Sequence, residues 1–213
     1  LLEDAESNVF HKAIIEEGRS IITIGAMGAK LKRWTYDETA KTWDQDTLWS
    51  QSWGGKFDRL RDIEIGDVDG DGLDEYVIAT HDYGVVAVYN PATGTTEAEI
   101  IEMDKKADTF VHEIEIGDID GDGNDDLFIG ATELDNNGSG AGGGYVIYGP
   151  LSGAIDLSTS ADATVLGDAS GDLAGAHVLV LGDVNSDGNQ DMLITASGDD
   201  TNGTDCDARD CAA

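Results

Sequence analysis

GDVDGDGLDE (66–75), GDIDGDGNDD (117–126) and GDVNSDGNQD (182–191) are three copies of one acidic pattern within a chain of 213 residues. Counted from the first Asp, each copy has oxygen-bearing side chains at positions 1, 3, 5 and 9 and a Gly at position 6. Ca²⁺ prefers roughly six to eight oxygen ligands, and alternate acidic positions let a short loop surround one ion. The sequence therefore predicts three calcium sites.

The predicted ligands are the side chains at positions 1, 3, 5 and 9 and the backbone carbonyl at position 7. In chain order they are Asp67, Asp69, Asp71, Leu73 and Glu75; Asp118, Asp120, Asp122, Asn124 and Asp126; and Asp183, Asn185, Asp187, Asn189 and Asp191. The third loop carries the neutral Asn185 where the others carry Asp. Because less ligand charge weakens calcium binding, we expect the third loop to saturate last.

An EF-hand starts with the same spacing but needs a Glu at position 12 and a helix on each side. Position 12 is Ile78, Ile129 or Ile194 in the three loops. Before the second loop, HEIEIGD (112–118) alternates apolar and polar residues, and DLFIGA (126–131) after it is a short apolar run. Both patterns predict strands. A single acidic loop is also compatible with a solvated turn, but three copies favour hairpins closed by a metal.

The first aspartates lie at 67, 118 and 183, a period of about 50 to 65 residues that is typical of propellers and solenoids. The segment 76–94 after the first loop has an approximate echo upstream at 21–43. We therefore expect four units. They are a degenerate first unit without a metal loop (1–55), units with the first and second calcium loops (56–110 and 111–170), and an incomplete unit with the third loop (171–213).

The loops and their flanks, above all GDASGDLAGAHVLVLGDVNSDGNQDMLITAS (167–197), resemble the FG-GAP repeats of integrin α-subunit propellers and the related VCBS repeats of bacterial surface proteins. Where the family has Phe-Gly, this chain has Leu-Ala-Gly at 173–175. Where the family has Gly-Ala-Pro, it has Gly-Ala-Thr at 130–132 and Thr-Ala-Ser at 195–197. The resemblance implies an all-β fold, a complete or partial β-propeller of about four repeat units with calcium-binding hairpin loops.

The composition restricts the partners. With 44 acidic and 12 basic residues the formal net charge is -32. Nucleic acid is excluded as a partner, since phosphate binding needs clustered Lys and Arg, and no apolar stretch approaches the ~20 residues of a membrane span. Extracellular loops of this kind bind calcium at about 10⁻⁴–10⁻³ M, so they would fill outside the cell. We expect an extracellular or cell-surface location and, because Leu1 begins the sequence, a processed piece of a longer protein.

The expected function is that of a non-catalytic, calcium-stabilised propeller segment in protein or glycan binding, adhesion or surface assembly, with another copy or another chain completing the propeller. The alternative is part of an extracellular propeller enzyme such as a polysaccharide lyase. No HExxH or GxSxG motif is present. The candidates for a catalytic carboxylate pair are Glu97, Glu99 and Glu102, or Glu113 and Glu115. The last two alternate with isoleucines, which predicts that they face solvent.

Two further residue sets have open interpretations. Trp34, Trp43, Trp49 and Trp53 all lie in the first quarter, where packing of the first unit or a sugar-stacking platform would explain them. Cys206 and Cys211 are expected to form a local disulfide in an oxidising compartment, with free thiols or a link to another chain as alternatives.

Overall fold

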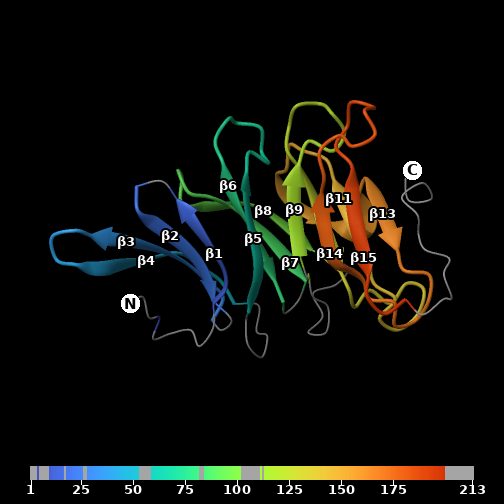
Figure 1. Cartoon of the computed structure of the whole chain (residues 1–213), viewed down its shortest axis with the longest axis horizontal. Helices are drawn as coiled ribbons and strands as arrows, with labels where there is room; N and C mark the ends of the chain where they lie inside the picture. Colours follow the sequence, from blue (N-terminus) through green and yellow to red (C-terminus); the bar gives the residue numbers. More distant parts are fainter. Residues whose placement is uncertain are drawn as a thin grey trace.

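The computed structural model describes residues 4, 10–16, 18–25, 28–52, 59–81, 84–101, 111 and 113–199. Strands make up almost all of the regular structure in these residues, and the helix α1 (Leu157–Ser160) is a single turn. The all-β class predicted from the sequence is confirmed. The strands form four sheets that follow one another along the chain and lie in a row (Figure 1).

The first two sheets are antiparallel meanders. The first contains β1 (Phe10–Glu16), β2 (Ser20–Gly25), β3 (Lys30–Asp37) and β4 (Thr42–Ser50). The second contains β5 (Leu60–Gly66), β6 (Glu75–Thr80), β7 (Val85–Asn90) and β8 (Thr95–Ile101). Each strand pairs with the next along the chain, as expected where short turns connect neighbouring strands.

The segment of chain between two strands of the third sheet adds a strand to the second sheet. The third sheet contains β9 (Glu113–Gly117), β10 (Asp126–Ala131), β11 (Gly143–Ile147) and β13 (Ala163–Leu166). Between β11 and β13 the chain leaves this sheet, and β12 (Gly153–Asp156) pairs in parallel with β8 at the outer edge of the second sheet. The fourth sheet contains β14 (Ala174–Val180) and β15 (Met192–Ala196) in the described residues.

Consecutive sheets pack face to face. The strands β1, β5, β9 and β14, one from each sheet, contact one another in that order and lie side by side in the middle of Figure 1. Apolar residues from adjacent sheets form shared cores, for example Ile24 with Ile63, Val77 with Leu127, and Phe128 with Val178. Because a middle sheet is covered on both faces, every residue of β6 and β10 is buried. This double burial explains why these strands have continuous apolar sequences instead of alternating ones.

Glycines allow the third and fourth sheets to approach closely. A Cβ atom at Gly130 would collide with the backbone oxygen of Gly175, and a Cβ atom at Gly175 would collide with that of Gly143. Gly175 also has a φ of 84°, a left-handed conformation that Gly adopts without strain. Gly130 and Gly175 lie in the segments 130–132 and 173–175. These segments occupy the places of Gly-Ala-Pro and Phe-Gly in the repeat that the sequence resembles.

The described sheets form an open row, with the first and last at opposite ends of the long axis (Figure 1). Both ends carry exposed apolar side chains. Ile15 in the first sheet is 84% exposed, and Leu179 and Leu193 in the fourth are 41% and 42% exposed. No helix in the described part of the chain is long and apolar enough to cross a membrane.

Candidate metal centre

All three acidic loops connect the two strands of a hairpin. The first joins β5 to β6, the second β9 to β10 and the third β14 to β15. In the first two hairpins the last strand pair before the loop lies at equivalent positions of the repeat: Gly66 pairs with Glu75, and Gly117 pairs with Asp126. The loops project from the same side of the row of sheets (Figure 1). The flanking strands predicted from the sequence, and the exclusion of an EF-hand, are confirmed.

One hydrogen-bond pattern shapes all three loops. The position-5 amide donates to the position-3 side chain, the position-6 amide to position 1, and the position-7 amide to position 5, over 2.8–3.2 Å. In the first loop these bonds run from Asp71 to Asp69, Gly72 to Asp67 and Leu73 to Asp71; the equivalent donors are Asp122, Gly123 and Asn124, and Asp187, Gly188 and Asn189. The bonds turn the acidic side chains toward the inside of the loop.

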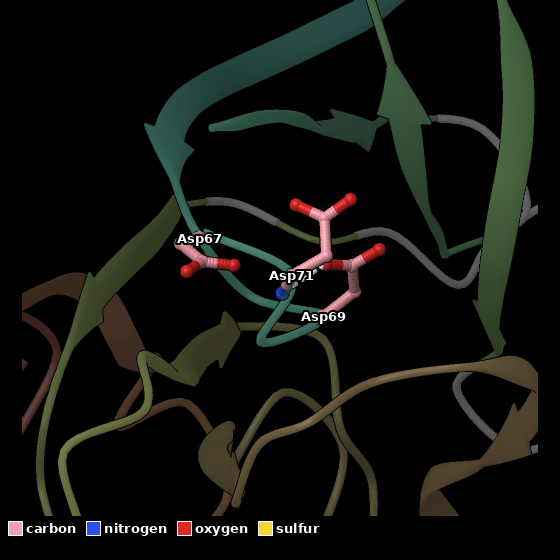
Figure 2. A group of neighbouring side chains, drawn as sticks. All are labelled: Asp67, Asp69 and Asp71. Atoms are coloured by element: carbon pink, nitrogen blue, oxygen red, sulfur yellow. Dashed lines mark hydrogen bonds between the residues drawn. The ribbon is translucent and has the colours of Figure 1, made fainter. Parts of the chain in front are cut away.

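The first loop gathers carboxylates. Oxygen atoms of Asp67, Asp69 and Asp71 lie within 4.8 Å of one another, and Figure 2 shows the three side chains on one turn of backbone, with the Asp71 amide bonded to Asp69. The Oδ1 atom of Asp67 is buried and has no hydrogen-bond partner. A buried anionic oxygen without a donor is costly, and a cation removes that cost. The three side chains therefore fit a hard cation.

Glu75, the position-9 residue, is fully buried, and neither carboxylate oxygen has a hydrogen-bond partner. It forms a second group with Asp69 and with Glu97 of β8, whose ligand atoms also lie within 4.8 Å of one another. Burial, and then the charges of Asp69, Asp71 and Glu97, raise the pKa of Glu75 to about 7. Sequence reasoning left Glu97 without a role, because no motif connects it to a loop more than twenty residues earlier.

In the second loop Asp118, Asp120 and Asp122 form the equivalent group, and Asp118 has a buried Oδ1 atom without a partner. Asp126 lies apart from this group. Its two oxygens accept the amides of Ile119 and Asp120, at 2.7 and 3.2 Å, and of Gly149, at 2.8 Å. Asp126, at the end of the loop, thus holds the residues at the start of the loop in place through these hydrogen bonds.

The third loop is held by its own side chains. The Asn185 Nδ2 atom donates to Asp187 at 2.9 Å and to Asp191 at 3.1 Å. Asp191 also accepts the amides of Val184 and Asn185, as Asp126 does for its own loop. In the described part of the chain the acids of this loop, including Asp183, do not form a group of three within 4.8 Å. An amide between two carboxylates neutralises them less than a cation would.

Neighbouring loops touch. The Asp67 amide donates to Asp125 of the second loop over 3.1 Å. The side chain of Asn124, at position 7, lies against Gly70 at position 4 of the loop before, and Asn189 lies against Gly121 in the same way. The loops therefore form a connected row along one edge of the molecule, and each loop supports the one that precedes it.

Glu113 and Glu115, on β9, lie in a partly different environment from the one predicted. Both side chains are half-buried, because β5 and β14 of the neighbouring sheets pack beside β9. Glu113 accepts the backbone amide of Val178 at 3.0 Å and contacts the His177 Nδ1 atom at 3.2 Å. Burial, followed by the charge of Glu64, raises the pKa of Glu115 to about 7. Both side chains are only partly exposed, while Ile114 between them is buried, so the structure agrees with the predicted solvent-facing positions only in part.

The other candidates separate by environment. Trp34 and Trp49 are buried, whereas Trp43 packs on Tyr36 at a centroid distance of 5.2 Å in a surface hollow with Ile15. Glu99 is half-buried on β8. Glu102, Trp53, Cys206 and Cys211 lie outside the described residues.

Comparison with known families supports the resemblance. Residues 67–129, from the first Asp of the first loop to β10, match the FG-GAP-like repeat. No curated protein matches the chain at a significant level. The matched segment includes both loops that gather three aspartates, and repeats of this family are typical of extracellular proteins. The chain therefore contains, at 67–129, a repeat of the FG-GAP-like family that its loops resemble.

Proposed function

We propose that the chain is a calcium-stabilised, non-catalytic β-propeller segment of a secreted or cell-surface protein. The observation that carries the proposal is the distribution of unpartnered carboxylates. Among the described residues, every buried carboxylate oxygen without a hydrogen-bond partner belongs to Asp67, Glu75, Glu97 or Asp118. All four residues belong to the acidic groups of the first two loops. The fold satisfies the other buried carboxylates of the described residues, and this contrast supports a ligand at these oxygens.

The ligand chemistry favours calcium. The groups offer carboxylate oxygens and contain no His or Cys, the nitrogen and sulfur ligands that zinc prefers. Mg²⁺ keeps much of its water and demands a regular octahedron at about 2.0–2.1 Å. A loop with crowded carboxylates and one backbone carbonyl suits the larger ion. The proposed ligands are those at positions 1, 3, 5, 7 and 9 of the three loops.

Isothermal titration with Ca²⁺ tests this proposal. The unmodified chain should bind calcium with affinities in the range of about 10⁻⁴–10⁻³ M that is typical of extracellular modules. Asp118→Asn should remove or weaken one binding event, because it neutralises a buried ligand oxygen. Asp46→Asn, on an exposed part of β4, is the matched control and should leave the titration unchanged. Absence of calcium binding by the unmodified chain would contradict the proposal.

The row of sheets also supports a proposal about partners. Position 2 of each loop is apolar: Val68 is fully buried and Ile119 is 6% exposed, because the next sheet covers them, but Val184 is 71% exposed. The fourth sheet thus carries the same apolar residue at position 2, but no following sheet covers it in the described residues. The first sheet likewise exposes Ile15 beside Tyr36 and Trp43. We propose that another copy or another chain covers these ends and completes the propeller.

Light scattering on the purified chain in calcium tests this completion. A dimer or larger assembly would support it. A stable monomer that binds no dye specific for exposed apolar surface would contradict it. The strand β15 is the expected junction, since an edge strand with unpaired backbone groups can accept a further strand.

The biological role that we propose is binding of a protein or glycan in adhesion or surface assembly. Its support is the FG-GAP-like repeat at 67–129, a repeat typical of extracellular proteins. Screening of the chain against glycan arrays and extracellular matrix proteins, with calcium and with chelator, would test it. Calcium-dependent retention of one ligand class is expected, and retention of none would contradict a binding role.

A second candidate function is cleavage of extracellular polysaccharide. The feature that favours it is the half-buried position of Glu115 on β9, because burial and the charge of Glu64 raise the pKa of Glu115 and a carboxyl protonated near neutral pH can act as a general acid. Assays on acidic and neutral polysaccharides would decide. Activity that Glu115→Gln abolishes would replace the non-catalytic proposal, and no turnover on any substrate would remove the enzyme candidate.

A further inference from the structure

Glu97 reaches the first loop from a distant strand. In the second sheet β7 separates β8 from β6, yet the Glu97 carboxylate lies within 4.8 Å of ligand oxygens of Asp69 and Glu75. Its Oε2 atom is buried and has no hydrogen-bond partner. The partly exposed Glu97 side chain thus directs one oxygen away from water and toward two other carboxylates, an arrangement that repels unless a proton or a cation lies between them.

An irregularity in the sheet places Glu97 there. Along the β7–β8 pair, Val88 is opposite Ala98 and Tyr89 is opposite Thr96, so Glu97 is the extra residue between two paired positions. Such a bulge changes the direction of one side chain, and bulges are common next to functional sites. The side chain of Asn90, at the end of β7, hydrogen-bonds the Glu97 carboxylate and helps to hold it in place.

The second carboxylate in the group, Glu75, provides independent support. It is fully buried and both of its oxygens lack hydrogen-bond partners, whereas the equivalent Asp126 accepts three backbone amides. The longer Glu side chain places its carboxylate within 4.8 Å of ligand oxygens of Asp69 and Glu97. In the described residues the second loop has no carboxylate group of this kind beyond its three aspartates.

We propose that Glu97 is a metal ligand supplied from outside the loop, which together with Asp69 and Glu75 binds the divalent cation of the first repeat. The inference rests on the proposed calcium function and adds a ligand that loop spacing does not predict. Calcium can use it, because its coordination number exceeds the four side chains that a loop of this type offers. The first repeat should consequently have the highest calcium affinity of the three.

A calcium titration followed by residue-resolved NMR tests the assignment. The amides of Gly72, Gly123 and Gly188 each donate to position 1 of their own loop, so each one reports on one site. Glu97→Gln should weaken the Gly72 response by about tenfold or more and leave the other two responses unchanged. Glu99→Gln, on the same strand, should leave all three unchanged. A Gly72 midpoint within twofold of the unmodified protein would overturn the assignment.

Thermal unfolding of the same variants separates a ligand from a structural side chain. Glu97→Gln removes one of three repelling charges, so its midpoint in chelator should rise, while the gain on adding calcium should shrink. A fall in both conditions by the same amount would overturn the proposal. If Gly72 of the unmodified protein does not respond to calcium, both the assignment and the calcium function fail. If it responds but Glu97→Gln has no effect, only the assignment fails.

Discussion

At the scale of single residues, backbone conformation decides which loop positions tolerate a side chain. Gly72, Gly123 and Gly188 at position 6 have φ values of 90°, 95° and 102°, and nothing lies within 4 Å of a Cβ atom at any of them. The glycines are therefore required by the left-handed backbone and not by packing. Position 6 could be predicted from the sequence, because a tight acidic turn needs such a residue.

Ser186 provides a test of this argument. It occupies position 4 of the third loop with a φ of 63°, where the other loops have Gly70 and Gly121 at 77° and 79°. Strain in a left-handed residue other than Gly destabilises the folded state by about 1–2 kcal/mol. A Gly at the same position avoids this strain but loses more conformational entropy on folding, which costs about 0.5–1 kcal/mol. Ser186→Gly should therefore raise the free energy of unfolding by on the order of 0.5–1 kcal/mol in urea denaturation. An unchanged or lower value would contradict the strain.

Glu115 provides a pH-dependent prediction. Its folded pKa of about 7 lies above the ordinary 4.5, so the folded state binds more protons between these values and loses stability as the pH rises through them. Glu115→Gln removes the ionisation. We expect the variant to gain about 1 kcal/mol over the unmodified protein at pH 8, after allowance for solvent screening of a half-buried group, and less at pH 5. Equal gains at both pH values in chemical denaturation would show that ionisation is not the cause.

At the scale of elements, the hairpin is the unit that sequence reasoning predicts well. Alternation before the loop and an apolar run after it are local signals, and both strands are present at each loop. The contacts between hairpins are not predictable in this way. The bond from the Asp67 amide to Asp125 joins residues 58 positions apart, and only the packing of the second sheet on the third creates it. The position of Glu97 at the first loop has the same origin.

Asp125→Ala tests whether one loop supports its neighbour. The variant removes the acceptor of the Asp67 amide and leaves the three grouped aspartates of its own loop in place. Loss of that bond should cost about 1–2 kcal/mol and weaken calcium binding at the first loop more than at the second. The Gly72 and Gly123 amide shifts in a calcium titration would measure the difference. Equal effects on both loops would contradict support between loops.

At the scale of the whole molecule, the sequence predicted the all-β class and the resemblance to an FG-GAP-like repeat, because both depend on patterns that recur. The exchange of β12 into the second sheet could not be predicted, since GAID (153–156) has no alternation that distinguishes one partner sheet from another. The open row of sheets depends on contacts between distant segments, which a single sequence does not encode in any local signal.

The thermal unfolding midpoint in excess chelator, compared with that in about 1 mM Ca²⁺, tests most directly the claim that the acidic loops hold structural calcium. If each site has a dissociation constant near 0.1 mM, it contributes about 1.4 kcal/mol, and three independent sites contribute about 4 kcal/mol. For a chain of this length the midpoint should rise by on the order of 10 °C with calcium. Equal Mg²⁺ should have a smaller effect. Identical midpoints in calcium and in chelator would contradict the account.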